Sequence, residues 1–365
     1  MENELQMTLN RLPAPTWNWL KMNESHVAYD KTPVWFSAST EISGDGMVHT
    51  KEKVDGWDRI VSGVGRDLDK LGELAGGETD VLETFGQTEE TYAVLTYDFP
   101  GGDYASCLYL HARESSTLNV TMVLTGGKDQ KGSSSVQVKA YAEKNAHIKI
   151  FAVQLLGQEF TCFHDFGGVC EEKAGIELVR VELGAGKLYA GGEVDLKGKE
   201  SSFEAHVGYH AKADQKLDMN YTVRHHGKKT TSLMEISGIL EEHSSKLFRG
   251  TIDFLRGCSG AKGDEREDIL MLGDDLVNQT IPLILCAEED VEGNHGATIG
   301  ELDEETLFYF AARGIGRKTA ENMMARAKLE KLCPEIADEE TRQRVMEQLE
   351  KPMPETAREE NADEA

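Results

Sequence analysis

The feature that most constrains the fold is a long series of short apolar runs beginning near residue 104. Clusters of glycine, aspartate, asparagine, lysine and serine separate the runs, whose starts recur roughly every 12 to 20 residues. Many runs alternate apolar with polar or small residues, as half-buried strands do. No amphipathic helix intervenes, which excludes a doubly wound α/β sheet. The runs lie at residues 118–124, 136–140, 148–156, 176–183, 203–209, 219–223, 233–240, 246–254, 269–272 and 281–286.

Strands without crossover helices leave three architectures open: a β-sandwich, a β-barrel and a β-solenoid. The 36 glycines of the chain suit the tight turns of any of them. Hairpin dipeptides such as Asn-Gly and Asp-Gly are scarce between the runs, and the loose cadence continues to the last run. We therefore favour a mainly β fold built on a solenoid.

The segments on either side of this series have a different character. Residues 1–103 show a mixed pattern that predicts a short helical and irregular region. After Gly300 the apolar period changes from two to about 3.6 residues, and Asp303 is suited to cap the first helix. The predicted helices lie at about 304–313, 317–332 and 339–350.

These patterns predict four units along the chain. A mixed or helical N-terminal region (1–103) precedes a solenoid core (104–300). A helical region (301–350) is expected to close the array and cover its terminal edge, since an exposed edge invites pairing with another chain. The acidic, proline-containing tail (351–365) is expected to be disordered.

The charge and the cysteines limit the partners and the location of the chain. The formal net charge is −26, from 65 acidic and 39 basic residues, so its field repels phosphate backbones and anionic lipids. No apolar run reaches the roughly 18 residues that a membrane span needs, and the N-terminus lacks a secretion-signal pattern. The six cysteines show no CxxC spacing, which argues for reduced thiols. We expect a cytoplasmic protein that binds neither nucleic acid nor membrane.

Other local patterns support alternative functions. The segment 314–320 resembles the glycine hairpin of helix-hairpin-helix DNA-binding modules. The alternative is a simple turn between two helices. The acidic runs 274–275, 288–290 and 301–305 are a solvated face, the paired carboxylates of a carbohydrate-active enzyme, or oxygen ligands for a hard cation. His225 and His226 end an alternating run, so their side chains should point to opposite faces, and we interpret His226 as structural.

His295 is the strongest candidate for a functional residue. Neutral imidazole is a borderline ligand suited to iron or zinc, and the flanking Gly293 and Gly296 leave room for close approach. The alternative is a histidine whose ring nitrogens bond the backbone where the solenoid gives way to helix. The residues alone identify no partner ligand.

A set of short motifs near His295 occurs in a characteristic order. They occupy residues 219–227, 230–232, 248–252, 281–282, 290–291, 295–300, 307–310 and 313–315. In content, order and spacing they resemble the SufB/SufD family of iron–sulfur cluster assembly proteins, closely from residue 218 to about residue 327. The resemblance implies a right-handed parallel β-helix followed by a small helical C-terminal region.

The resemblance is closer to the D-type than to the B-type members of the family. B-type chains carry Glu-Ala-Thr where this chain has Gly296-Ala297-Thr298, and Glu267 occupies the position of the B-type assembly cysteine. The resemblance thus implies a non-catalytic scaffold subunit. Such a subunit pairs with a SufB-type subunit, or with itself, and recruits the SufC ATPase through residues 301–350.

The resemblance also implies a role for His295. This residue is expected to contact iron or a nascent iron–sulfur cluster at the subunit interface as a metal ligand, with His226 and Glu267 as supporting positions. The cluster is then transient, and reduced flavin is a further candidate cofactor of the assembled complex. No cofactor is expected to stay bound to this chain alone.

Overall fold

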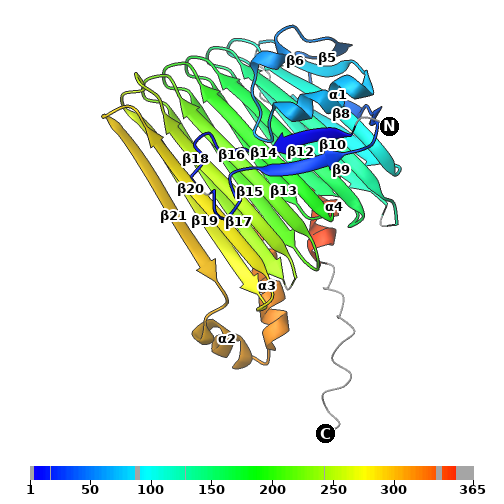
Figure 1. The fold of residues 1–365 in the computed structure, drawn as a ribbon, viewed down its shortest axis with the longest axis vertical. Coiled ribbons are helices and arrows are strands. Elements are labelled where there is room, and N and C mark those ends of the chain that lie inside the picture. Colours follow the sequence, from blue (N-terminus) through cyan, green and yellow to red (C-terminus); the bar gives the residue numbers. More distant parts are fainter. Residues whose placement is uncertain are drawn as a thin grey trace.

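Two parallel β-sheets face each other along most of the chain (Figure 1). The computed structural model describes residues 4–350 except 17, 87–90, 128, 242 and 334–338, without the side chains of 348–350. From β6 to β21 successive strands alternate between the sheets, so one sheet, the even sheet, holds the even-numbered strands of this series and the other, the odd sheet, holds the odd-numbered ones. One turn of the chain therefore contributes one strand to each sheet.

The strands of the two sheets are regular in length. The even sheet contains β6 (Thr79–Thr84), β8 (Gly102–Ala112), β10 (Gly132–Ala142), β12 (Phe160–Cys170), β14 (Lys187–Leu196), β16 (Lys216–His225), β18 (Ser245–Phe254) and β20 (Val277–Cys286), with β5 (Met47–Glu52) antiparallel at its first edge and β3 (Val34–Trp35) beside β8. The odd sheet contains β7 (Tyr92–Phe99), β9 (Thr117–Gly126), β11 (His147–Leu155), β13 (Gly175–Glu182), β15 (Ser202–Ala211), β17 (Thr231–Glu241), β19 (Ala261–Leu272) and β21 (Val291–Gly300), with β4 (Ser39–Ser43) antiparallel at its first edge.

The architecture confirms the predicted solenoid. Strands of neighbouring turns pair in parallel and in register, so that, for example, Glu265 in β19 lies beside His295 in β21. Side chains alternate between the inside and the outside of the coil, and those of both sheets meet in one continuous apolar core. Leu124, Phe166 and Val207 are among the buried members of this core. Parallel pairing excludes the antiparallel sandwich and barrel.

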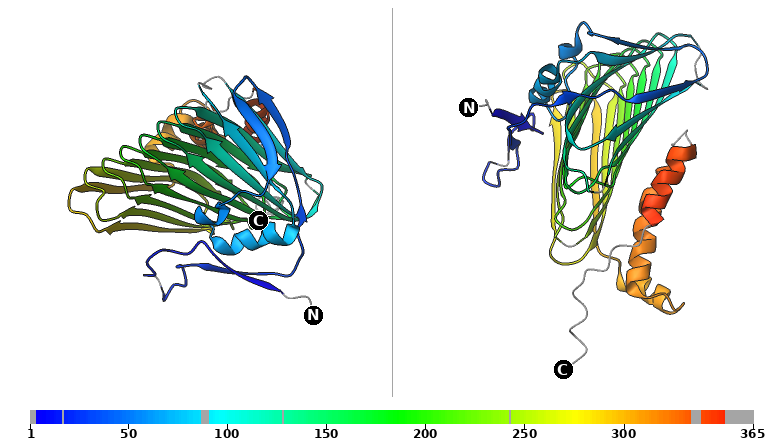
Figure 2. Two further views of the ribbon diagram at one scale, coloured as in Figure 1. Left: turned by 90° about the horizontal axis from the view of Figure 1, so that it is seen from above. Right: turned by 90° about the vertical axis from the view of Figure 1, so that its right-hand side faces the viewer.

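The N-terminal region contains more strand than predicted. β1 (Leu5–Leu9) and β2 (Ser25–Tyr29) form an antiparallel hairpin on the outer face of the even sheet (Figure 2). The helical parts of the N-terminal region are short, namely η1 (Trp57–Arg59), η2 (Arg66–Leu68) and α1 (Asp69–Ala75). β6 and β7 already belong to the parallel sheets, so the array begins upstream of residue 104.

Close backbone packing fixes the segment 60–64 on the outer face of the even sheet. The amide of Gly63 donates to the carbonyl of Phe166 at 3.0 Å, and the carbonyl of Gly63 accepts from Asn220 Nδ2 at 2.8 Å. Beneath the segment, a Cβ added to Gly191 would lie 2.6 Å from the carbonyl carbon of Gly63. Glycine at position 191 is thus what allows the two backbones to meet.

Three C-terminal helices confirm the predicted change of period. They are α2 (Glu304–Ala311), α3 (Arg317–Glu330) and α4 (Glu339–Glu350). Asp303 caps α2 as expected, because its Oδ1 accepts from the amide of Thr306 at 2.6 Å. Residues 351–365, predicted to be a disordered tail, lie outside the described residues. No described helix has the length and apolarity that crossing a membrane would require.

The helices do not close the end of the array, and the prediction that they cover its terminal edge is wrong. α3 and α4 lie along the outer face of the odd sheet (Figure 2). Leu329 and Ala325 of α3 pack there against outward-facing valines and isoleucines of the strands. Since that sheet face is apolar, burying it against the helices is favourable, and β20 and β21 stay exposed.

Candidate functional site at the open end of the solenoid

The candidate site lies on the last turn of the solenoid. Within the described residues, no further strand pairs with β20 or β21, which end the even and odd sheets (Figure 1). Gly293 in β21 faces inward, since a Cβ there would contact Phe254 and Ile284 of the even sheet. His295, two residues further along the strand, faces the same way. The open end therefore presents an inward-facing histidine.

His295 contacts a buried carboxylate one turn back along the solenoid. Its Nδ1 lies 3.2 Å from Oε1 of Glu265, whose side chain is only 2% exposed, whereas that of His295 is 28% exposed. Burial raises the pKa of the Glu265 carboxyl. The interaction with Glu265 raises the pKa of His295. The other ring nitrogen, Nε2, has no polar partner among the residues described here.

This placement differs from the alternative considered for His295. The residue lies in the middle of β21, not where the solenoid gives way to helix, because β21 continues to Gly300. Its Nδ1 faces a carboxylate rather than the backbone. A partly exposed imidazole is suited to bind a metal ion or cluster when a carboxylate holds Nδ1 and, among the described residues, Nε2 has no polar partner.

Glu267 lies on the same inward face of β19 as Glu265 and is fully buried. It forms an ion pair with Lys246 of β18, which is also fully buried. Thr280 of β20 completes the group, since its Oγ1 accepts from Lys246 at 2.8 Å and donates to Glu267 at 2.7 Å. Burial lowers the pKa of Lys246. Glu267, which occupies the position of the B-type assembly cysteine, is thus a carboxylate already paired with Lys246.

His226 does not join the site. It lies just after β16 on the outer face of the even sheet, where its Nε2 contacts Oδ1 of Asp195 at 3.1 Å. His225 points the opposite way, is buried, and has both ring nitrogens bonded to Thr230 and Ser232. The predicted division of the two histidines between opposite faces is confirmed.

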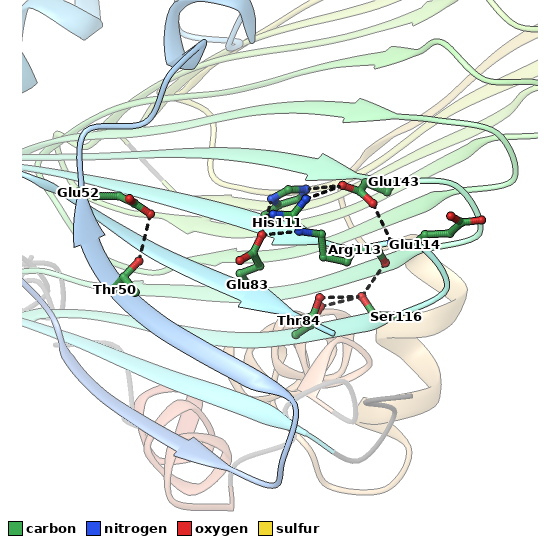
Figure 3. Close-up of polar contacts among 9 residues, drawn as sticks. All are labelled: Thr50, Glu52, Glu83, Thr84, His111, Arg113, Glu114, Ser116 and Glu143. Atoms are coloured by element: carbon green, nitrogen blue, oxygen red, sulfur yellow. Dashed lines mark hydrogen bonds and ion pairs between the residues drawn. The ribbon is translucent and has the colours of Figure 1, made fainter. Parts of the chain in front are cut away.

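A second histidine cluster, far from the open end, illustrates the contrast with His295. His111 of β8 has Nδ1 at 3.0 Å from Glu83 and Nε2 at 2.9 Å from Glu143 (Figure 3). Arg113 contacts the same two carboxylates, at 2.5 and 3.2 Å. Both nitrogens of His111 are occupied and its carboxylates are neutralised, so this cluster stabilises the outer face of the sheet and leaves no nitrogen to bind a ligand.

The remaining sequence candidates are accounted for by local structure. Within the 314–320 segment, residues 314–316 belong to the turn between α2 and α3, and residues 317–320 form the first turn of α3, where Arg317 is paired with Glu321 and Glu301. Across the described part of the chain, no group of three or more histidine, cysteine, aspartate or glutamate side chains is placed to hold a metal ion. A metal site at His295 therefore needs ligands from elsewhere.

Comparison with known proteins identifies the family. The family model of the SufBD core domain of the SUF system for FeS cluster assembly matches residues 102–328, which is more than half of the chain. The chain belongs to the SufBD family. The match covers the solenoid strands from β8 onward together with α2 and most of α3.

Curated relatives place the chain near SufD. It is 21% identical to the iron–sulfur cluster assembly protein SufD of Bacillus subtilis over 342 residues, which are 89% of this chain and 78% of that protein. It is 28% identical to Escherichia coli SufD over 120 residues (33% of this chain, 28% of that one). It is 29% identical to the chloroplastic SufBD family protein ABCI8 of Arabidopsis thaliana over 191 residues, half of this chain and 34% of that protein. Neither a carbohydrate-active enzyme nor a DNA-binding module is supported.

Sequence reasoning missed two residues of the site. Glu265 and Lys246 were not singled out, although both contact residues that were. Glu265 precedes His295 by 30 residues, the offset that also joins Asp264 to Asn294. That offset is one turn of the solenoid, so a known turn length would have paired Glu265 with His295.

Proposed function

We propose that this chain is a SufD-like, non-catalytic scaffold subunit of a SufBCD-type iron–sulfur cluster assembly complex. In this proposal it pairs with a SufB-type subunit in the cytoplasm and recruits the SufC ATPase, which hydrolyses the nucleotide. The observation that carries the proposal is the position of His295 at the open end of a SufBD-family solenoid, where its Nε2 meets no polar partner in the described part of the chain.

The open end supports a subunit interface. β20 and β21 are ten residues long each, and no strand that the structure describes pairs with their outer edges, so their backbone groups are available to another chain. Two large apolar side chains beside them, Ile284 and Ile299, are exposed. A second copy of this chain could use the same edges, so the proposal includes a homodimer as the alternative pairing.

The C-terminal helices support an ATPase docking surface. α2 has no fully buried residue, and its Phe308 and Tyr309 are 75% and 54% exposed. Exposed neighbouring aromatics on a helix are typical anchors of a protein–protein contact. The proposal assigns these residues to the contact with the SufC-type subunit.

Iron or a nascent cluster is the cargo of the proposed interface. His295 would contribute Nε2, and thiolates would come from the partner, because Glu267 occupies the position of the B-type cysteine and is paired with Lys246. Reduced flavin is retained as a candidate cofactor of the assembled complex, not of this chain.

Anaerobic co-purification tests the pairing. The tagged chain, expressed with SufB-type and SufC-type subunits, is expected to recover both, and Ile299→Asp should reduce recovery of the SufB-type subunit at least tenfold, because a charge enters an apolar contact. The matched control is Val48→Asp, which changes a similarly exposed residue (46% against 43%) in β5, at the opposite end of the solenoid. A wild-type chain recovered alone and free of iron would contradict the proposal.

A further inference from the structure

Glu265 is an ionisable side chain in a costly position. It lies in the middle of β19, points into the space between the sheets and is 2% exposed. Its carboxylate rests on the backbone of Gly250 in the opposite sheet, where a Cβ would lie 2.0 Å from Oε2. Burying a carboxylate is unfavourable unless a partner compensates the charge. The glycine at position 250 thus leaves space for the carboxylate of Glu265, and the unfavourable burial of this carboxylate requires a compensating contact.

Among the polar groups around Glu265, His295 is the one that contacts its carboxylate. Lys246, the nearby buried cation, donates to Glu267 and Thr280. Apart from the 3.2 Å contact with His295 Nδ1, Oε1 of Glu265 has no polar partner among the described residues. The carboxylate thus compensates its burial by holding one nitrogen of the exposed histidine.

We propose that Glu265 is the positioning residue of His295, an inference that rests on the proposed function. Its Oε1 accepts a hydrogen bond from Nδ1–H, which fixes the ring and leaves Nε2 as the nitrogen that donates its electron pair to Fe²⁺ or a cluster. If the ring starts as imidazolium, the Nε2 proton leaves for solvent when the metal binds; in the neutral ring Nε2 already carries the free electron pair. In both cases the Nδ1 proton stays on the ring, hydrogen-bonded to Glu265. Ligand histidines in proteins generally donate their second N–H to a carboxylate or carbonyl in this way, and loss of such a partner typically costs about 10–100-fold in metal affinity.

Two substitutions separate the positioning role from a merely structural one. Glu265→Gln keeps the size of the side chain but offers an amide that can donate to Nδ1, which reverses the tautomer. Gly250→Ala leaves Glu265 charged but displaces its carboxylate, by the 2.0 Å overlap with Oε2. A third variant, Glu265→Asp, retains the carboxylate and should retain part of the Nδ1–H preference that Glu265→Gln loses. All variants are compared with wild type for folding by circular dichroism.

The tautomer of His295 is the first measurement. The full-length chain is labelled with ¹⁵N-histidine and measured by NMR at a pH where the ring is neutral. The signals of His295 are assigned as those that disappear in His295→Ala, and they are expected to show the Nδ1–H form. Glu265→Gln and Gly250→Ala should both shift His295 toward the Nε2–H form. An unchanged tautomer in both folded variants would overturn the positioning role.

Iron binding is the second measurement. Fe²⁺ titrated anaerobically into the complex with the SufB-type and SufC-type subunits should bind about 10–100-fold more weakly when Glu265 is replaced by glutamine. If His295→Ala weakens Fe²⁺ binding and Glu265→Gln does not, the positioning role fails and the proposed function stands. If His295→Ala has no effect, the proposed function fails, and the tautomer measurement still decides whether Glu265 orients the ring.

Discussion

Replacing Lys246 with methionine is expected to lower the free energy of unfolding by about 3–5 kcal/mol. The substitution removes a cation that is fully buried and paired with the fully buried Glu267. Glu267 then keeps only Thr280 as a polar partner of those that the structure describes. A buried charge without its counter-ion is destabilising, because water cannot replace the lost partner. Denaturant unfolding followed by circular dichroism measures the loss.

Two controls make this prediction specific. The double variant Lys246→Met with Glu267→Leu removes both charges and should recover most of the lost stability, since an apolar pair of similar volume is often neutral. Lys262→Met breaks an exposed pair with Glu292 and should cost less than about 1 kcal/mol. A loss for Lys246→Met no larger than for Lys262→Met would show that the buried pair does not stabilise the solenoid.

Gly191→Ala is expected to destabilise the chain by about 2–3 kcal/mol and to release the segment 60–64 from the even sheet. The added Cβ would lie 2.6 Å from two backbone atoms, the carbonyl carbon of Gly63 and the amide nitrogen of Val64. Backbone atoms cannot rotate away as a side chain can, so the segment must move. Faster hydrogen exchange of residues 60–64, with a lower free energy of unfolding, is the expected signature.

Gly300→Ala is the matched control for this prediction. Gly300 also lies in a strand, but an added Cβ meets nothing within 4 Å, so the change in stability should stay within about 0.5 kcal/mol. Unaltered exchange of residues 60–64 in Gly191→Ala would contradict the backbone packing described for this face.

Local patterns in the sequence were sufficient to predict the core of the fold. Alternation in the runs predicted strands, the absence of intervening helices favoured the solenoid, and Asp303 marked the start of α2 correctly. These signals are local, because they depend on the period of side chains along one strand or helix.

The features that were missed or predicted wrongly depend on contacts between distant parts of the chain. The N-terminal segment is held by Gly191, more than a hundred residues away, and no local signal marks that approach. The C-terminal helices were expected to cover the open end, but the outward apolar face of the odd sheet offers Leu329 a better surface. His295 was identified from its own neighbours, whereas Glu265 required the length of a solenoid turn.

The most direct test of the account measures iron and acid-labile sulfide in the complex reconstituted anaerobically from this chain and its SufB-type and SufC-type partners. His295→Ala is expected to lower both at least tenfold while the subunits stay associated. His26→Ala, which alters an exposed histidine of the N-terminal hairpin, should leave both unchanged. Cluster formation by the His295→Ala complex at the wild-type level would contradict the central claim that the open end of this solenoid serves cluster assembly through His295.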